Sequence, residues 1–443
     1  MKTNRYDVVV LGGGIGGYYC ARSLAKGNKS VAIVENDLFG GTALRWGALP
    51  VKKVLDSFKG INKESKMVKE TLINNWEDEL NGLVKNIENS LLKDNIDIYY
   101  GNGEFLDSNR FRLDEVILEG DYFVIATGTE PSSIDGIHID GKNIITHKEA
   151  LNIKDLPDNI VILGGNVEGI EFAALYAELG VKVTLIEKED CILPGNDYDL
   201  VEPIEKYLVE KGVKIIKGVG AKSAEVEGKG VNVLLDNGAS IKGERCLVTL
   251  LRKPNFPRGI ENTRIKTNKD KIITYENLLT DEKRIFAIGD INGILGMGHV
   301  AIQQGIQVAN YILNNGPVKI FYDILPRAVF TLPEMAGVGK QEWELKRDNI
   351  SYNVGISSFK DTWRGWAKGI QEGFVKVILN KDEVVLGVWM VGENVSEYVG
   401  LLKILIENKC TLGQILSSLV IHPSLNEAIV EALLQSRNKK VIK

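Results

Sequence analysis

Three glycines near the start of the chain are spaced for binding a dinucleotide. Residues 12–17 read GGGIGG, which fits G-x-G-x-x-G through Gly12, Gly14 and Gly17 after an apolar run. Gly12 permits a tight turn, Gly14 lets the backbone approach a pyrophosphate, and Gly17 lets a helix pack closely on a strand. Glu35 ends the next apolar run, where it can accept hydrogen bonds from ribose hydroxyls.

A second glycine turn is less regular. It reads GGNVEG, so Gly164 and Gly169 are kept and Asn166 takes the place of the middle glycine. The Asn166 side chain takes space that a pyrophosphate needs, and Glu168 places a negative charge close to the phosphates. We expect NAD(H) at this turn, the alternative being a domain retained only for architecture.

The two turns lie in two copies of one segment. Residues 6–35 and 159–187 each give a β-rich run, a glycine turn, a helical pattern and a second apolar run that ends in Glu. In the second copy this acid is Glu187, and a carboxylate there favours NAD over NADP because it repels a 2′-phosphate. The repeat predicts an α/β fold with two tandem Rossmann-like dinucleotide-binding domains.

After about residue 320 the sequence no longer shows the strand, turn, helix and strand of the two repeats. Residues 373–392 alternate like antiparallel strands around a turn at 380–383, and helical patterns follow at 394–408 and 424–437. These patterns predict a third, α+β domain. The expected domains are residues 1–147 with 277–320, residues 148–276, and residues 321–443.

Composition excludes several classes of protein. The 443 residues carry a net charge of −5 without a basic cluster, which argues against a nucleic-acid partner. No apolar run is long enough to span a membrane, so a cytoplasmic protein is expected. The four cysteines are far apart in the sequence and there are four histidines, so no metal site is predicted.

With these motifs placed, the chain from about residue 6 to about residue 435 resembles the FAD-dependent pyridine nucleotide-disulfide oxidoreductases, such as dihydrolipoamide dehydrogenase, glutathione reductase and mercuric reductase. The resemblance implies FAD at the first turn, NAD(H) at the second, and a C-terminal dimerisation domain that makes a homodimer. Its motifs are ATG at 126–128, IFAIGDINGILGMGHVAIQQG at 285–305, FTLPEMAGVG at 330–339 and HPSLNEAI at 422–429.

The resemblance also implies residue roles. Asp290 would hold the ribityl chain of FAD, and the backbone around Met297 and His299 would approach the isoalloxazine ring. The other residues assigned to FAD, besides the first turn and Glu35, are Gly41, Thr42, Lys52, Gly103, Thr127 and Gly128.

The stretch GGTALRWGALPVKK is similar to the GGTCxxxxC motif that supplies the redox disulfide of the family. Ala43 and Ala48 stand at the two cysteine positions, and methyl groups can neither attack a disulfide nor store two electrons. By position Lys52 would lie near flavin N5 and pair with Glu171, with the adjacent Lys53 as the alternative.

His422 and Glu427 match the acid–base pair that the family contributes across its dimer interface. Two positions depart from the family pattern: Val420 replaces the first His of His-x-His-Pro, and Leu251 replaces a Gly before R-x-P-N. Because histidine titrates near neutral pH, His422 can still protonate a reduced acceptor. The alternative is a buried, hydrogen-bonded histidine with no role in chemistry.

Three functions fit this sequence. The first is an FAD-dependent oxidoreductase that passes electrons from NADH to an acceptor, as a diaphorase does, without dithiol exchange. The second is a disulfide reductase whose two cysteines were mutated to alanine. The third is a flavoprotein that does not turn over, or one that exchanges electrons with a partner protein. The expected partners are a second copy of the chain and a small-molecule or protein electron carrier.

Overall fold

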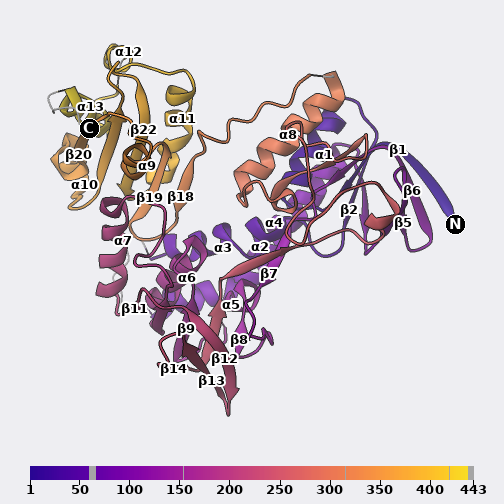
Figure 1. Cartoon of the computed structure of the whole chain (residues 1–443), viewed down its shortest axis with the longest axis horizontal. Coiled ribbons are helices and arrows are strands. Elements are labelled where there is room, and N and C mark those ends of the chain that lie inside the picture. Colours follow the sequence, from indigo (N-terminus) through magenta and orange to yellow (C-terminus); the bar gives the residue numbers. More distant parts are fainter. Residues whose placement is uncertain (59–65, 153, 315, 419, 438–443) are drawn as a thin grey trace. The chain divides into compact units, whose positions relative to one another are not determined.

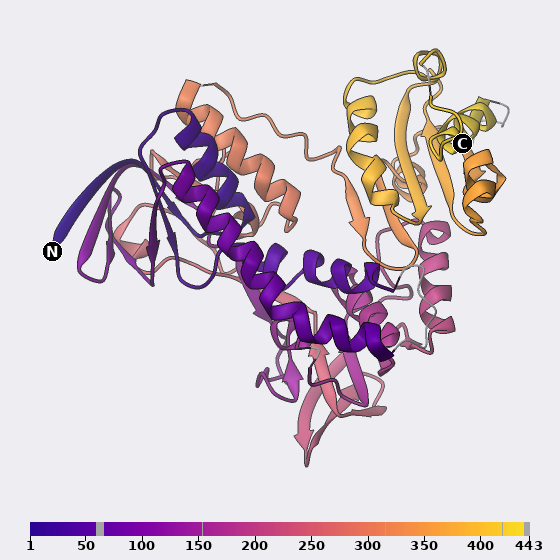
Figure 2. The same cartoon turned by 180° about the vertical axis from the view of Figure 1, so that it is seen from behind.

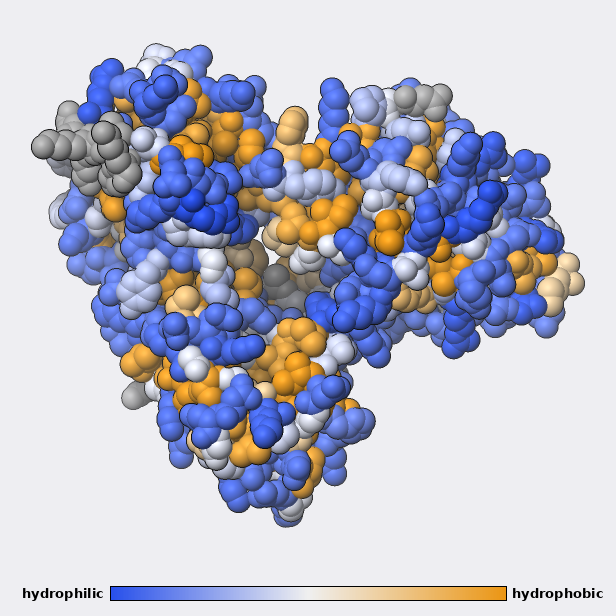
Figure 3. Space-filling view, in the orientation of Figure 1, coloured by the Kyte–Doolittle hydropathy of each residue, from blue (hydrophilic) through white to orange (hydrophobic). Residues whose placement is uncertain are grey.

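The computed structural model describes residues 1–58, 66–152, 154–314, 316–418 and 420–437 (Figure 1). The chain divides into two compact units. Within the described ranges, no helix is both long and apolar enough to cross a membrane. Hydrophilic residues cover most of the face seen in Figure 3. Unit 1 comprises residues 1–50, 62–156 and 250–320, and unit 2 comprises residues 51–61, 157–249 and 321–443.

Unit 1 is built on a mixed sheet with the strand order β3-β2-β1-β6-β5-β4, and β17 also pairs with β6. The strands at its centre, β1, β2 and β6, are parallel. Its strands are β1 (Lys2–Leu11), β2 (Val31–Glu35), β3 (Asp97–Tyr100), β4 (Glu104–Asp107), β5 (Arg110–Leu113), β6 (Val116–Ile125), β7 (Thr129–Ser132), β8 (Ile144–Ile145), β16 (Leu251–Pro254) and β17 (Ile285–Ala287). Its helices are α1 (Ile15–Lys26), α2 (Gly41–Arg45), α4 (Lys66–Lys93), α5 (His147–Ala150), α8 (Gly298–Asn314), η1 (Ile260–Asn262) and η2 (Gly289–Asn292); α3 (Ala48–Asp56) continues into unit 2.

Alternating residues of β1 build two cores, because successive strand side chains point to opposite faces of a sheet. Val8 and Val10 pack against α1, α4 and α8, which lie on one face (Figures 1 and 2). Val9 and Leu11 pack into the core of the other face. Cys20 of α1 is fully buried in the first of these cores, and burial raises the pKa of its thiol to about 12.

Unit 2 repeats the strand, turn, helix and strand of unit 1, so the predicted repeat is confirmed. Its parallel strands follow the order β11-β10-β9-β15. Burial in β15 raises the pKa of the Cys246 thiol to about 12. The elements are β9 (Asn159–Leu163), α6 (Val167–Glu178), β10 (Lys182–Ile186), α7 (Tyr198–Glu210), β11 (Lys214–Ile216) and β15 (Arg245–Val248), with an antiparallel sheet of β12 (Ala221–Glu227), β13 (Gly230–Leu235) and β14 (Ser240–Gly243).

The C-terminal part of unit 2 is an antiparallel sheet in the order β18-β19-β22-β21-β20. The predicted hairpin is confirmed, because β21 pairs antiparallel with β22. Helix α13 covers β20, where a Cβ on Gly355 would lie 1.7 Å from the carbonyl oxygen of Ala432. The elements are β18 (Arg327–Val329), β19 (Glu334–Gly339), α9 (Glu342–Arg347), β20 (Asn353–Ser358), η3 (Phe359–Asp361), α10 (Trp363–Lys368), β21 (Phe374–Leu379), β22 (Val385–Gly392), η4 (Val395–Tyr398), α11 (Val399–Glu407), α12 (Leu412–Leu416) and α13 (Glu427–Arg437).

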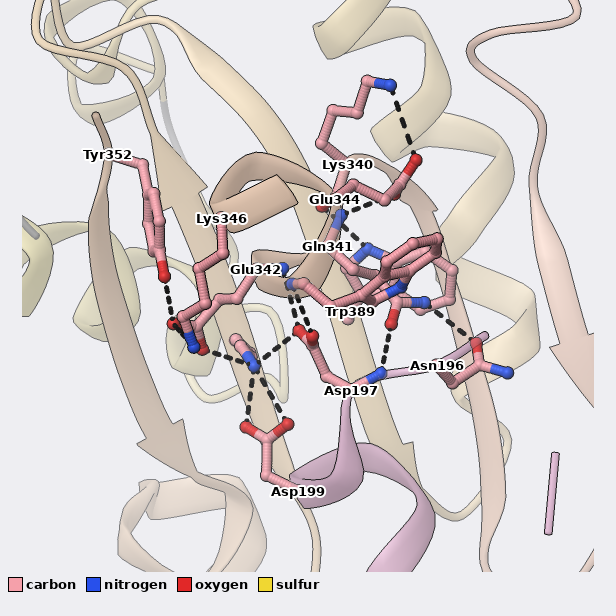
Figure 4. Close-up of polar contacts among 12 residues, drawn as sticks. Asn196, Asp197, Asp199, Lys340, Gln341, Glu342, Glu344, Lys346, Tyr352 and Trp389 are labelled. Carbon is pink, nitrogen blue, oxygen red and sulfur yellow. Dashed lines mark hydrogen bonds and ion pairs between the residues drawn. The ribbon is translucent and has the colours of Figure 1, made fainter. Parts of the chain in front are cut away.

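Asp197 and Asp199, at the start of α7, lie among polar residues of this sheet and of α9 within unit 2 (Figure 4). Lys376 of β21 is 1% exposed, and its Nζ lies 2.9 Å from Asp197 Oδ2, 2.8 Å from Asp199 Oδ2 and 2.6 Å from Glu342 Oε1. Asp197 also accepts hydrogen bonds from the first amides of α9, those of Glu342 and Trp343. The three carboxylates raise the pKa of Lys376 despite its burial.

Candidate functional site

The first glycine turn has the geometry that the sequence predicts. A Cβ on Gly17 would lie 2.0 Å from the Gly12 carbonyl oxygen, and one on Gly12 (φ +109°) would lie 2.4 Å from Ala126 O. Both positions therefore require glycine for packing. Gly14 differs, because a Cβ there would meet only Gly41 Cα, at 3.9 Å. The open space beside Gly14 and the N-terminus of α1, which carries no side-chain cap, fit a pyrophosphate.

Glu35 is already oriented by the backbone around it. Its Oε2 accepts a hydrogen bond from the Gly13 amide at 2.6 Å, and its Oε1 accepts two from the amides of Asn36 and Asp37, each at 2.9 Å. A carboxylate oxygen has lone pairs left after such contacts. The arrangement therefore presents a fixed acceptor for ribose hydroxyls at the end of β2.

A polar chain runs through the part of unit 1 assigned to FAD. Arg252 of β16 donates from Nη2 to Thr42 Oγ1 at 3.4 Å and from Nε to Thr129 Oγ1 at 2.8 Å. Thr129 Oγ1 donates in turn to Asp290 Oδ2 at 3.2 Å. Thr127 Oγ1 is buried without a hydrogen-bond partner among the described residues. An orphaned hydroxyl beside this chain fits a polar cofactor such as FAD.

The structure thus brings Gly14, Gly41, Thr42 and Asp290 into one region of unit 1, as the sequence predicts. Sequence reasoning missed Thr129 and Arg252. The R-x-P-N motif was a usable signal for the arginine, but the pairing of β7 with β16, which delivers it to Thr129, is not visible in the sequence.

The remaining FAD assignments receive less support. A Cβ on Gly103 would lie 2.1 Å from Phe111 Cε1, so core packing alone accounts for that glycine. Gly128 has a φ of +64° and open space around it. Met297 is half-buried and comes directly before α8, and His299 is exposed on the first turn of that helix.

Residues around Ala43 form a cation–aromatic pair that the sequence did not predict. The guanidinium of Arg45 lies 4.3 Å from the centre of the Trp46 ring, and Nη1 lies 2.5 Å from Asp37 Oδ2. Arg45 is buried, and its Nε has no hydrogen-bond partner in the described part of the chain. The stack gives Trp46 a packing role. The side chain of Ala48 lies outside the described residues.

The second glycine turn has the same backbone contacts as the first, but the side chain of Asn166 occupies the position of the middle glycine. Glu187 Oε2 accepts from the Gly165 amide at 2.6 Å, and a Cβ on Gly169 would lie 1.8 Å from Gly164 O, as in the first turn. Asn166 caps α6, because its Oδ1 accepts from the Gly169 amide at 3.1 Å while its Nδ2 donates to Thr249 O at 2.6 Å. The amide of Asn166 is therefore held by its own domain.

Lys52 and Glu171 do not form the ion pair that the resemblance implies. Lys52 Nζ lies 3.4 Å from Glu397 Oε1 and 4.6 Å from the centre of the Phe330 ring. Glu171 is buried and accepts a hydrogen bond from the Phe330 amide at 2.9 Å. Burial raises the pKa of Glu171 to about 8, so at neutral pH this carboxyl carries little charge to attract a lysine.

His422 and Glu427 are paired as the sequence predicts. His422 Nδ1 lies 2.6 Å from Glu427 Oε1, and Glu427 Oε2 accepts from the Ser424 amide at 2.9 Å. The hydrogen bond from His422 lowers the pKa of Glu427. The His422 side chain is 63% exposed in the single chain.

These features agree with comparisons to known proteins. A family model of pyridine nucleotide-disulphide oxidoreductases matches residues 6–305, and the model of their dimerisation domain matches residues 325–433. The chain belongs to this family. Its members bind FAD and use NAD(P)H, so FAD is a cofactor of this chain, and the chain is an FAD-dependent oxidoreductase. The predicted fold of two Rossmann-like domains and a dimerisation domain is confirmed, and the latter supports a homodimer.

Relatives within the family carry out different reactions. The chain is 32% identical to dihydrolipoyl dehydrogenase of Bacillus subtilis (strain 168), covering 98% of this chain and 99% of that protein. It is 27% identical to soluble pyridine nucleotide transhydrogenase of Mycobacterium bovis, covering 98% and 97%. The crystal structure of LpdA from Mycobacterium tuberculosis superposes with a TM-score of 0.88 at 26% identity, covering 98% and 99%.

Proposed function

We propose that this chain takes electrons from NADH and passes them from FAD directly to an acceptor, without a dithiol step. The proposal is supported by the open space beside Gly14 at the first turn, which fits a pyrophosphate, and by the methyl groups that residues 43 and 48 carry in place of sulfur. FAD supplies the redox chemistry when bound, and the chain orients it through Glu35, Thr42 and Asp290. His422 and Glu427 would move protons to and from the acceptor. The chain would divide into the domains expected from the sequence, residues 1–147 with 277–320, residues 148–276, and residues 321–443.

Anaerobic titration of the purified holoprotein tests this proposal. We expect NADH to bleach the flavin absorbance faster than NADPH does, because the Glu187 carboxylate repels a 2′-phosphate. Adding ferricyanide or a quinone should then restore the oxidised spectrum. A flavin that NADH leaves oxidised, or that no such acceptor reoxidises after dithionite reduction, contradicts the proposal.

Restoring cysteine at residues 43 and 48 tests whether dithiol chemistry has been removed from a disulfide reductase. If it has, the Ala43→Cys/Ala48→Cys protein should show a red-shifted charge-transfer band on reduction and should reduce a disulfide such as lipoamide. The Ala43→Cys single variant is the control, because one thiol cannot form the internal disulfide. A double variant with neither signal excludes that alternative and leaves direct transfer from flavin.

A second candidate is a flavoprotein that a partner protein reduces, and the Asn166 cap favours it. If the Asn166 side chain obstructs the pyrophosphate, Asn166→Gly should speed NADH bleaching roughly 10-fold or more, a barrier difference of about 1.4 kcal/mol. Asn166→Ser, which retains a cap, is the control. Fast bleaching in the natural chain with no gain in Asn166→Gly contradicts this candidate.

A further inference from the structure

Helix α2 is held in place by other segments of unit 1. A helix of five residues is too short to be stable by itself in water, so contacts with the rest of the unit must fix it. At its start, Gly40 forms a bridge with Gly14, and a Cβ on Gly41 would lie 2.9 Å from Gly14 Cα. Leu44 packs against the buried core of the unit. The position of Thr42, which is assigned to FAD, therefore depends on what holds α2.

Arg45 anchors the last turn of this helix. It is 9% exposed. Its Nη1 lies 2.5 Å from Asp37 Oδ2, and its guanidinium lies 4.3 Å from the centre of the Trp46 ring. The Asp37 amide donates to Glu35 Oε1 at 2.9 Å, so Asp37 belongs to the loop that orients the acceptor for ribose hydroxyls. Arg45 thus joins α2 to the loop that follows β2.

One donor of this buried guanidinium is left without an acceptor. Arg45 Nε is buried and has no hydrogen-bond partner in the part of the chain that the structure describes. A buried N–H without an acceptor is destabilising, and such groups are nearly always satisfied in folded proteins. An unpaired donor in a binding region therefore points to an acceptor on the molecule that binds there.

The two segments that Arg45 joins are those expected to bind the adenosine diphosphate part of FAD. Gly14, next to the start of α2, leaves the open space that fits the pyrophosphate, and Glu35 presents the acceptor for ribose hydroxyls. A guanidinium suits this part of FAD, because its planar N–H groups match the oxygens of a phosphate and it stays charged at any physiological pH. Its charge also offsets those of Glu35 and Asp37, which would otherwise repel a pyrophosphate.

We propose that Arg45 is a further FAD-binding residue, whose Nε donates to an oxygen of the adenosine diphosphate part. Asp37 and Trp46 hold the guanidinium in place for this contact. When FAD is bound, one side chain then fixes both the helix that carries Thr42 and the loop that orients Glu35. This role depends only on the binding of FAD and not on the route by which electrons leave the flavin, so it is independent of the proposed function.

The affinity of the full-length apoprotein for FAD and for ADP tests this contact without any turnover. Fluorescence titration with FAD, and competition by ADP, should show both affinities falling at least about 10-fold in Arg45→Met, a loss typical of a hydrogen bond to a charged group. Arg22→Met is the matched control and should leave both affinities within about twofold. Arg22 likewise pairs with a carboxylate, that of Asp94, and lies over a ring, that of Tyr18, but its Nε is already paired.

Arg45→Lys separates the contact with FAD from a purely structural role. The lysine keeps a cation for Asp37 but has no Nε donor, and an ammonium does not reproduce the guanidinium fork. Denaturation followed by circular dichroism should show an apoprotein about as stable as the natural chain, while the affinities for FAD and ADP still fall at least about 5-fold. The proposal is overturned if Arg45→Lys binds both ligands as the natural chain does, because the ion pair with Asp37 then suffices. It is equally overturned if Arg45→Met loses no more affinity than Arg22→Met.

Discussion

Replacing Lys376 with methionine is expected to lower the free energy of unfolding by about 3–5 kcal/mol, the usual result of breaking a buried ion cluster from one side. The change leaves Asp197, Asp199 and Glu342 facing one another without the ammonium that all three contact. Chemical denaturation of the purified protein, followed by circular dichroism, measures the difference. Lys206→Met is the control, because Lys206 pairs with Glu372 at the surface, where such a pair contributes about 0–1 kcal/mol.

The pH dependence of this difference follows from the raised pKa of Lys376. A lysine whose pKa is higher in the folded protein stabilises it fully below the unfolded value, about 10.4, and stops doing so as the pH rises through the folded value. The difference between the natural chain and Lys376→Met should therefore be constant from about pH 7 to pH 10 and shrink at higher pH. A difference below about 1 kcal/mol at neutral pH contradicts the role given to the cluster.

Gly14→Ala is expected to yield a folded protein that binds FAD poorly. The added methyl group meets only Gly41 Cα in the protein but occupies the space assigned to the pyrophosphate. Overpacking of this kind costs about 1–3 kcal/mol, which is roughly a 5- to 150-fold loss of affinity. Fluorescence titration of apoprotein with FAD measures the affinity, and circular dichroism verifies the fold.

Two other glycine variants show whether the loss in Gly14→Ala concerns FAD binding rather than packing. Gly17→Ala places a methyl group 2.0 Å from Gly12 O, so it should disturb the packing of α1 and lose stability as well as FAD. Gly82→Ala, on α4 with open space around it, should change neither FAD affinity nor stability adversely. Unchanged FAD affinity in Gly14→Ala would place the pyrophosphate elsewhere.

Local patterns explain how much of this fold the sequence could predict. The repeat at 6–35 and 159–187 carries its own turn glycines and acid, so each βαβ unit is specified by residues close together in the chain. The hairpin at 373–392 is likewise specified by alternation around a turn. The ribbon of β7 and β16 joins residues more than a hundred positions apart, and no local pattern indicates such a pairing.

Site residues, too, could be predicted from the sequence only where a short segment fixes their geometry. Glycine positions and the His422–Glu427 pair follow from motif spacing, because short segments fix their geometry. The partner of Lys52 does not, since burial neutralises Glu171 and an acid from another segment, Glu397, lies closer to the amine.

The distribution of sulfur has a consequence for how this enzyme tolerates poisons. Arsenite and alkylating agents inactivate dithiol enzymes by capturing a reactive thiolate. Here residues 43 and 48 offer no sulfur, burial raises the thiol pKa values of Cys20 and Cys246, and the partly buried Cys191 and Cys410 are far apart in the sequence. If electrons pass directly from FAD to the acceptor, as we propose, arsenite should leave the NADH-to-acceptor activity of this chain unchanged.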